Sequence, residues 1–311
     1  MKTLVVGGSG FIGSHVADAL TAAGLSVRLL DVVPSPYRVS AQEMIVGDCT
    51  DGGVVKRAMQ GCDIVYNFAG LSDLDEAQAR PLDTIRTTVL GNAVLLDAAR
   101  AEGVNRYVLA STIYVYSRAG GFYRCSKQAC ELYVEEYQRN FGLDYTILRY
   151  GTVYGRRAGE RNSVHRYLKQ ALVDRRVVGY GIGNEIREYI HVTDAAKSSV
   201  QILDGAFRNE HVLLTGPSGM RLLDFLEMIR EIVGAEVQVE LRSPQTRQDS
   251  EGPMGHYSIT PYSFRPKLGR KLVSSSYVEL GQGLLDCLEE LHVRLSQQEM
   301  PNQVSAGAPR A

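Results

Sequence analysis

Short apolar runs alternate with amphipathic stretches along the first half of the chain, and this rhythm constrains the fold more than any other feature. Continuously apolar runs of this length are typical of strands buried on both faces of a sheet. The runs are LVVG (4–7), VRLLD (27–31), MIVGD (44–48), DIVYNFAG (63–70), RYVLAS (106–111) and DYTILR (144–149). Strands connected by helices run parallel through right-handed crossovers. The rhythm therefore predicts an α/β fold, a Rossmann-type doubly wound parallel sheet.

Glycine follows two of the amphipathic stretches at the position that a helix C-cap favours. The stretch 14–23 is followed by Gly24, and the stretch 82–102 by Gly103. We expect a helix over each stretch, lying between two strands of the sheet.

The rhythm loosens after Arg149, which indicates a second, smaller part of the chain. Helical patterns at 194–205 and 222–233 are separated by loop-rich sequence, and 243–266 is rich in Pro, Ser and Gly. The last residues are polar with little to bury, which is typical of disorder. The predicted parts are a Rossmann domain at 1–150 completed by parts of 187–215, a smaller C-terminal substrate-binding lobe at 151–186 and 216–296, and a disordered tail at 297–311.

The charge and cysteine content exclude several classes of function. Lys and Arg (34) balance Asp and Glu (35), so no bulk positive field favours nucleic acid or an anionic membrane. The five cysteines include no CxxC pair, which argues against a disulfide framework and a metal site. Neither a signal sequence nor an apolar span is evident. We expect a soluble cytoplasmic protein that uses no metal and binds neither nucleic acid nor membrane.

The loop GGSGFIG, between the first predicted strand and helix, has the spacing of a dinucleotide-binding turn. Gly7, Gly10 and Gly13 would allow a tight turn, the approach of a diphosphate and close helix packing. Phe11 and Ile12 would open the helix whose N-terminus donates to the phosphates. The alternative is a structural turn without a ligand.

The carboxylates that end the next two strands predict which dinucleotide binds. Asp31 would accept hydrogen bonds from the ribose hydroxyls and repel a 2′-phosphate, and no basic residue follows it directly. The cofactor is therefore predicted to be NAD rather than NADP. Asp48 and Cys49, after the third strand, are candidates for the adenine edge.

Tyr123 and Lys127 are spaced four residues apart in FYRCSK, which places both side chains on one face of a helix. Taken alone, the pair could equally be a solvated helix face. Upstream, STIYVYS (111–117) supplies Thr112 at the end of the fifth strand. With the glycine loop, this constellation resembles the short-chain dehydrogenase/reductase superfamily.

The resemblance implies roles for these three residues. Tyr123 would accept the proton during hydride transfer, Thr112 would hydrogen-bond the sugar oxygen, and Lys127 would hold the nicotinamide ribose. A phenol is a poor base at neutral pH, so we expect the ammonium and the positive nicotinamide to lower the pKa of Tyr123.

Further segments resemble the extended branch, the NAD-dependent epimerase/dehydratases acting on nucleotide sugars, with UDP-glucose 4-epimerase as the nearest type. The resemblance implies cofactor contacts from NFAGL, through Phe68, Ala69 and Gly70, and substrate contacts from two later segments. LRYGTVYGRR would contribute Tyr150 and Thr152, with Tyr154 at the same pocket. REYIHVTDAA would contribute Arg187, which would clamp the diphosphate. The alternative for Arg187 is an ion pair with Glu185 or Glu188.

Departures from the family pattern bear on the reaction. Dehydratases and decarboxylases of the family carry acidic residues after the strand-end hydroxyl, whereas this chain has Ile113 and Tyr114. Without that carboxylate, the chemistry expected is C4 oxidation of a UDP-sugar and return of the hydride to the opposite face, which is epimerisation. Net oxidoreduction, dehydration and a non-catalytic NAD-binding role are the alternatives. Thr88 and Thr152 also replace asparagines of the family.

The roles of several other side chains stay open. Base or sugar contacts are conceivable for five, which equally fit core, turn or surface positions: His256, Tyr257, Tyr262, Arg242 and Arg247. Cys125 and Cys130, on the helix of Tyr123, fit small buried apolar residues better than a thiol mechanism.

The resemblance also implies a homodimer formed by helices 82–102 and 124–140. Apolar surface for it would come from Val89, Leu90, Val94, Leu95, Leu132 and Val134. These residues must also cover the sheet.

Overall fold

The protein was analysed as a computed structural model that describes residues 1–117, 119–217, 219–242, 268–274 and 276–299. Its main sheet has eight parallel strands in the order β13-β10-β6-β5-β4-β1-β2-β3. The strands are β1 (Lys2–Val6), β2 (Ser26–Asp31), β3 (Gln42–Val46), β4 (Ile64–Asn67), β5 (Arg106–Thr112), β6 (Tyr145–Tyr150), β10 (Glu210–Leu214) and β13 (Arg270–Lys271). The order reverses direction at β1, so β1 and β4 flank a switch point where ligands bind in such sheets.

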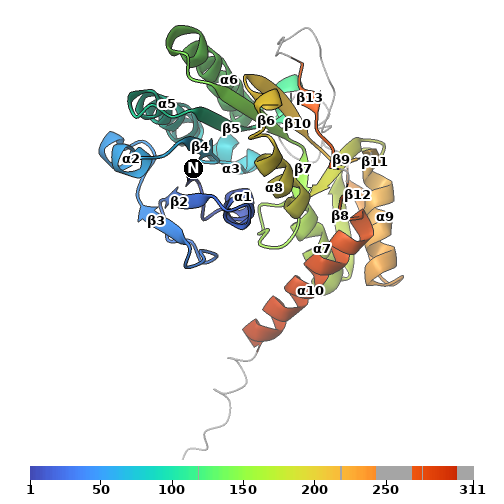
Figure 1. Ribbon diagram of the computed structural model, residues 1–311. Coiled ribbons are helices and arrows are strands. Elements are labelled where there is room, and N and C mark those ends of the chain that lie inside the picture. Colours follow the sequence, from blue (N-terminus) through green and yellow to red (C-terminus); the bar gives the residue numbers. More distant parts are fainter. Residues whose placement is uncertain (118, 218, 243–267, 275, 300–311) are drawn as a thin grey trace, which may run out of the picture.

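Helices cover both faces of this sheet (Figure 1). One face packs on α1 (Phe11–Ala22) and α8 (Val192–Gln201), and the other on α2 (Gly52–Met59), α5 (Gly91–Ala101) and α6 (Gly121–Phe141). Successive residues of β1 point to opposite faces: Leu4 joins the α5–α6 core and Val5 joins the α1–α8 core. The predicted doubly wound fold is confirmed.

The helix predicted over 82–102 is interrupted by a π-helical segment. It consists of α4 (Pro81–Thr84), π-helical Ile85–Leu90 and α5, and Gly103 follows with a φ of 68°. Single π turns are often found at functional sites, because they redirect side chains from the regular helical path. Here the segment carries Thr88 toward β4. The short α3 (Leu74–Ala79) precedes it.

The smaller lobe has two short sheets and its own core. Its strands are β7 (Thr152–Tyr154), β8 (Arg176–Tyr180), β9 (Ile186–His191), β11 (Gly219–Arg221) and β12 (Gln238–Arg242). Its helices are α7 (Ser163–Asp174), α9 (Leu222–Val233) and α10 (Leu280–Glu299), whose apolar sides form a third core. The predicted helix 222–233 is confirmed.

Two boundaries differ from the prediction. β13, which falls within the range assigned to the lobe, pairs with β10 at the edge of the main sheet, because parallel pairing satisfies its backbone groups there. The tail was expected to begin at 297, yet α10 runs to Glu299; residues 300–311 lie outside the part described. In the described ranges, every helix is too short or too polar to span a bilayer.

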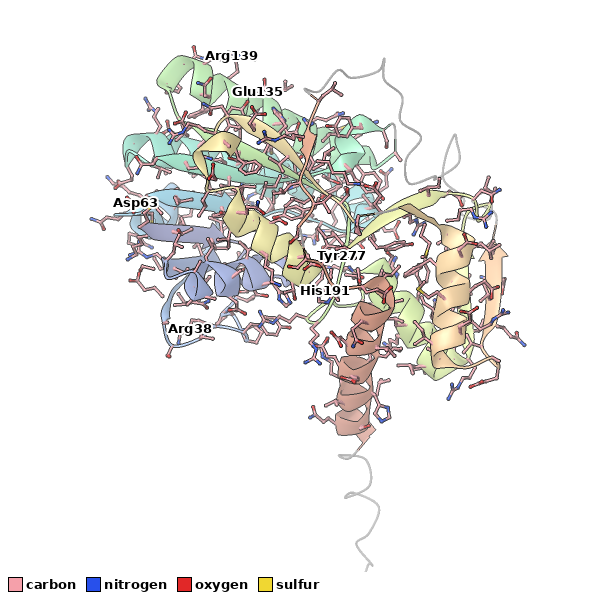
Figure 2. The ribbon with its side chains drawn as sticks, turned by 45° about the vertical axis from the view of Figure 1, so that its right-hand side comes forward. Arg38, Asp63, Glu135, Arg139, His191 and Tyr277 are labelled. Carbon is pink, nitrogen blue, oxygen red and sulfur yellow. The ribbon has the colours of Figure 1, made fainter. Side chains whose placement is uncertain are left out.

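The chain segment between β13 and α10 ties the lobe to the main sheet. The backbone N–H of Val278 donates to Asp194 Oδ2 of α8 at 2.8 Å. Figure 2 shows Tyr277 beside His191, the residue that caps α8, and both line one small cavity. The segment therefore crosses the junction of the two parts.

Candidate active site

The glycine loop leaves β1 in a backbone conformation that requires glycine. Gly7 has a φ of 79°, and a Cβ there would lie 2.8 Å from the backbone of Phe68. A Cβ on Gly13 would collide with the carbonyl oxygen of Gly7. Gly10 is the N-cap of α1 and supplies no side chain to the first amides. Helix N-termini carry unpaired N–H groups and a partial positive charge, so the turn fits a diphosphate.

Asp31 lies directly over this loop. Its Oδ2 accepts from the N–H of Ser9 at 2.9 Å, and Ser9 Oγ donates to the carbonyl of Val33 at 2.8 Å. These bonds fix a carboxylate beside the dinucleotide turn, at the end of β2. The geometry fits ribose hydroxyls and disfavours an added phosphate. Sequence reasoning missed Ser9, whose role depends on how the loop folds onto β2.

Asp48 and Cys49 follow β3 at the same edge of the sheet. Asp48 is exposed, and its Oδ1 accepts from the N–H and the hydroxyl of Thr50, at 2.8 and 2.9 Å. Cys49 is buried, and burial raises the pKa of its thiol to about 11. Any contact of Cys49 with adenine would therefore come from its backbone.

The loop after β4 presents Phe68, Ala69 and Gly70 beside the glycine turn. Asn67 Oδ1 accepts from the N–H of Ala69 at 3.0 Å, which ends the strand earlier than the predicted residue 70. Gly70 has a φ of 142°, and a Cβ there would lie 2.9 Å from Thr88 Oγ1. That hydroxyl oxygen is buried without a hydrogen-bond partner among the described residues. An unpaired buried hydroxyl beside a glycine that leaves backbone accessible fits a missing polar ligand.

Thr112, Tyr123 and Lys127 meet where β5 ends against α6. The side chain of Thr112 lies close enough to the hydroxyl of Tyr123 to lower the pKa of that phenol. Lys127 is buried, its Nζ donates to the carbonyl of Ala110 at 2.7 Å, and the same atom lies 6.0 Å from the centroid of the Tyr123 ring. The solvated-face interpretation of this pair is therefore wrong.

The pKa of Tyr123 does not fall as expected. Burial raises the pKa of Tyr123 to about 12, and the nearby side chain of Thr112 opposes this only in part. Burial likewise lowers the pKa of Lys127. The Lys127 ammonium is directed at Ala110 and does not lower the pKa of Tyr123. A lower value needs the positive charge of a bound cofactor.

Arg187 lies on β9 and is almost completely buried. It hydrogen-bonds Tyr167 of α7, and its Nε has no partner among the described residues. The suggested ion pairs are wrong within that part of the chain: Glu185 accepts from the amides of the turn 182–183, and Glu188 pairs with Lys271. A buried guanidinium without a carboxylate partner requires an anion or strong acceptors. Tyr167 carried no recognisable signal in the sequence.

The other predicted substrate contacts differ among themselves. Thr152 is partly exposed at the start of β7. Tyr150 is buried in the α1–α8 core with its hydroxyl 2.6 Å from Ser199 Oγ, and Tyr154 is buried in the lobe core beside Cys287. Both tyrosines are packed in cores, on the faces that their strands bury, and their contact with a substrate stays a prediction.

Tyr114 is the second residue after Thr112, at a position where the sequence comparison led us to expect a carboxylate in a dehydratase. Its N–H donates to Thr112 Oγ1 at 3.3 Å, and its ring packs edge-on against Tyr123 with the centroids 6.4 Å apart. It also lies within electrostatic range of Arg187. A phenol therefore lies between the Thr112–Tyr123 pair and the guanidinium.

Of the remaining candidate side chains, some lie within the described residues and others lie outside them. Arg242 pairs with Glu240 at 2.6 Å. Cys130 is buried, and burial raises the pKa of its thiol to about 11, whereas Cys125 is exposed, contrary to expectation. The others lie outside the described residues: Arg247, His256, Tyr257 and Tyr262.

A family-level comparison matches residues 3–214 to the NAD dependent epimerase/dehydratase family. The chain belongs to this family. Members use NAD, and the glycine turn, Asp31 and the unpaired Thr88 hydroxyl fit that cofactor. The earlier resemblance to the family and the prediction of NAD are confirmed.

Individual members of the epimerase/dehydratase family are similar to the chain over most of its length. It is 29% identical over 275 residues to UDP-glucose 4-epimerase of Corynebacterium glutamicum, covering 78% of this chain and 83% of that protein. It is 28% identical over 302 residues to dTDP-glucose 4,6-dehydratase of Mycobacterium tuberculosis, covering 86% and 87%. The solved UDP-glucose 4-epimerase of Thermotoga maritima shares the fold, with a TM-score of 0.79, 24% identity and coverage of 95% and 100%. The family thus includes epimerases and dehydratases at comparable distances.

Proposed function

We propose that the chain is a nucleotide-sugar C4 epimerase that works with bound NAD on a UDP-sugar. The observation that carries this proposal is Tyr114, a phenol beside the Thr112–Tyr123 pair where elimination chemistry needs a carboxylate. The similarity to a UDP-glucose 4-epimerase supports the reaction and the uridine nucleotide.

Three side chains have separate roles in the proposed reaction. Tyr123 takes the proton from the sugar C4 hydroxyl, and Thr112 hydrogen-bonds the same oxygen and orients it. Lys127 holds the cofactor ribose and adds positive charge near the phenol. Bound NAD would supply the hydride acceptor for C4 and the hydride donor for the return step. Burial raises the pKa of Tyr123 to about 12, so the phenol is a suitable base only when the positive charge of the bound cofactor favours phenolate.

Arg187 supplies the anchor that epimerisation requires. The 4-keto sugar must turn over within the pocket while the nucleotide stays bound, so the diphosphate needs a strong local partner. The buried guanidinium with its unpaired Nε meets this need. Thr152 lies at the start of β7, next to β9 in the same sheet, and would border the sugar.

Dehydration is the second candidate. A dTDP-glucose 4,6-dehydratase is nearly as similar as the epimerase. Dehydration needs a group that protonates the leaving C6 hydroxyl, and Tyr114 is the nearest group at that place. Net oxidoreduction would show itself as a lasting change in NADH absorbance.

The first test is incubation of the purified protein, without added cofactor, with UDP-glucose, UDP-N-acetylglucosamine and UDP-glucuronate. Proton NMR of the sugar should show a C4 epimer accumulating from one of them. A 4-keto-6-deoxy product would replace epimerisation with dehydration. No product with any of the three, even after addition of NAD, would count against both.

We also propose a homodimer through the surface of α4, the π-helical segment and α6. Several apolar side chains are exposed on it: Leu82, Ile85, Leu90, Leu132, Tyr133 and Phe141. Of the predicted interface residues, Leu95 and Val134 are buried under the sheet instead. Light scattering of the wild type should give twice the chain mass, and Leu132→Glu should give the mass of one chain.

A further inference from the structure

A buried ion pair that the proposed mechanism does not use lies one helical turn beyond Lys127. Glu131 of α6 binds Arg149 of β6 through two bonds, Nε to Oε1 at 3.0 Å and Nη2 to Oε2 at 2.6 Å. The Arg149 side chain is fully buried and that of Glu131 is 3% exposed. Burying two charges is costly, so such a pair is weak evidence of a purely stabilising role.

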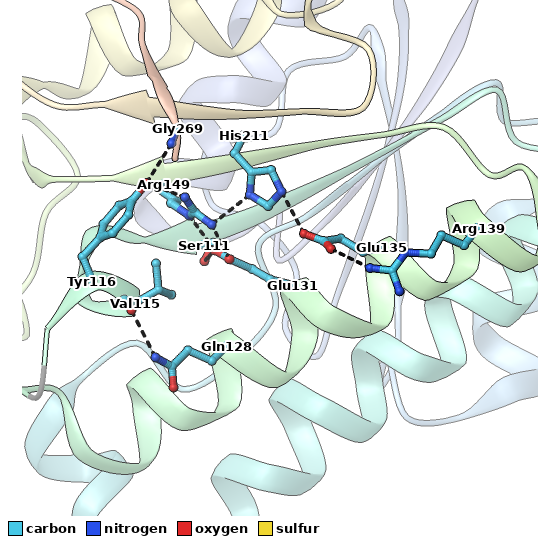
Figure 3. Close-up of polar contacts among 10 residues, drawn as sticks. All are labelled: Ser111, Val115, Tyr116, Gln128, Glu131, Glu135, Arg139, Arg149, His211 and Gly269. Carbon is cyan, nitrogen blue, oxygen red and sulfur yellow. Dashed lines mark hydrogen bonds and ion pairs between the residues drawn. The ribbon is translucent and has the colours of Figure 1, made fainter. Parts of the chain in front are cut away.

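The pair is bonded to the strand end and the turn that carry the site. Ser111 Oγ, one residue before Thr112, donates to Glu131 Oε1 at 2.5 Å. Arg149 Nη1 donates to the hydroxyl of Tyr116, the last residue of the 3₁₀ turn that contains Tyr114. The same hydroxyl accepts from the N–H of Gly269 at 2.9 Å (Figure 3). The pair thus links α6 to β5, to the Tyr114 turn and to the segment entering β13.

His211 of β10 belongs to the same network, and its contacts show which of its ring nitrogens carries the proton. Arg149 Nη2 lies 2.9 Å from His211 Nδ1, and a guanidinium can only donate, so Nδ1 must be unprotonated. The proton then lies on Nε2 and is donated to Glu135 Oε1 at 3.0 Å. Glu135 in turn pairs with Arg139 at 3.2 Å, toward the outer end of α6 (Figure 2).

Glu131 follows Lys127 by one turn of α6, so the two side chains leave the helix on the same side, and Arg149 of β6 is the charged group bonded to Glu131. The titratable neighbours that act on Lys127 are Tyr123, Cys130 and Glu131 of α6, and β5 contributes the neutral carbonyl of Ala110. Burial lowers the pKa of Lys127, while Cys130 and Glu131 raise it. Burial raises the pKa of the Cys130 thiol to about 11, so that thiol is neutral at working pH. The negative charge near the ammonium therefore comes from Glu131.

We propose that Glu131, held by Arg149 and Ser111, is a positioning residue that keeps Lys127 protonated and fixes the end of β5 for catalysis. This inference rests on the proposed function for its effect on turnover, but its effect on Lys127 does not require turnover. The residue touches neither substrate nor reacting atoms and acts through Lys127 and Ser111.

The direct test is the titration of Lys127 by NMR of protein labelled with ¹³C at lysine Cε. The Lys127 signal is assigned by its loss in Lys127→Arg. In Glu131→Gln the titration midpoint of Lys127 should move to lower pH than in the wild type. Glu136→Gln, an exposed carboxylate on the same helix, is the matched control and should leave it unchanged. An unchanged midpoint in Glu131→Gln would overturn the proposal, whatever reaction the enzyme catalyses.

A double variant separates positioning from folding. Glu131→Gln alone leaves the buried Arg149 without its carboxylate partner, which is strongly destabilising, whereas Glu131→Gln with Arg149→Met removes both charges and should fold. The proposal predicts that the double variant recovers its free energy of unfolding while kcat stays about 10²-fold below the wild type, because the end of β5 is misplaced. Recovery of kcat together with stability would show a merely structural pair and overturn the proposal.

Discussion

The hydroxyl of Tyr123 on α6 lies near the side chain of Thr112 at the end of β5, which lowers the pKa of the phenol against the effect of burial. We expect Tyr123→Phe to lower kcat by roughly 10²–10⁴-fold, because it removes the proton acceptor and leaves the ring in place. NAD affinity and the free energy of unfolding should stay close to those of the wild type. Steady-state rates and calorimetric titration with NAD measure both, and a variant with near-normal kcat would exclude Tyr123 as the base.

The carboxylate of Asp31 is predicted to set the choice of cofactor. Asp31→Asn removes the charge and keeps a side chain that can accept from Ser9. NAD affinity should fall about 10-fold or more, since a hydrogen bond to a charged group contributes roughly 1.5–3 kcal/mol. Affinity for NADP should fall less or rise. Titration of the wild type and of Asp31→Asn with NAD and with NADP measures these affinities. Tighter binding of NADP than of NAD by the wild type would refute this role.

Arg187 should matter for the nucleotide and not for the cofactor. Arg187→Lys keeps the charge but loses the planar donor fork, so we expect UDP to bind roughly 10-fold more weakly. Affinity for NAD should be unchanged. Arg221→Lys, an exposed arginine paired with Asp224 at 2.8 Å, is the control. Equal UDP affinity in the Arg187 variant and the wild type would remove Arg187 from the substrate site.

Acid should destabilise the fold through its buried histidines. Burial lowers the pKa of His15, His165 and His191 below the ordinary value. The unfolded chain then binds protons more readily than the folded one, so the free energy of unfolding is highest above the unfolded pKa of about 6.5 and falls as pH decreases below it. Urea unfolding at about pH 7.5 and about pH 5.5 measures this loss.

His191→Asn should reduce that loss. Asparagine can still cap α8 by accepting from Thr193, as His191 Nδ1 does at 3.4 Å, but it does not titrate. His292→Asn, at an exposed position on α10, serves as the control. If His191→Asn and the wild type lose equal stability on acidification, His191 is not a source of the effect.

The parts of the fold that follow local rules were predictable. Strand, glycine turn, helix and strand-end carboxylate follow one another along the chain, so the positions of Gly7 and Asp31 could be predicted from their spacing alone. The burial of Tyr150 and Tyr154 in cores could not be predicted in this way, because the direction in which a strand residue points depends on which elements pack on each face. Leu95 and Val134 were misplaced at the dimer surface for the same reason.

The pKa shifts and ion pairs of the site could not be predicted from the sequence. The raised pKa of Tyr123 depends on the burial of the phenol, and the lack of a carboxylate partner for Arg187 among the described residues depends on where Glu185 and Glu188 turn. The network of Glu131, Arg149 and His211 joins residues from α6, β6 and β10. Such long-range contacts carry no spacing signal that a sequence can reveal.

The most direct test of the proposed chemistry is to run the reaction in D₂O with the UDP-sugar that is turned over, and to record the mass of the product. Epimerisation at C4 returns the hydrogen that was removed, so the account predicts a product with the mass of the substrate and no deuterium bound to carbon. A product lighter by one water and carrying solvent deuterium at carbon would mean dehydration. It would contradict the assignment drawn from Tyr114.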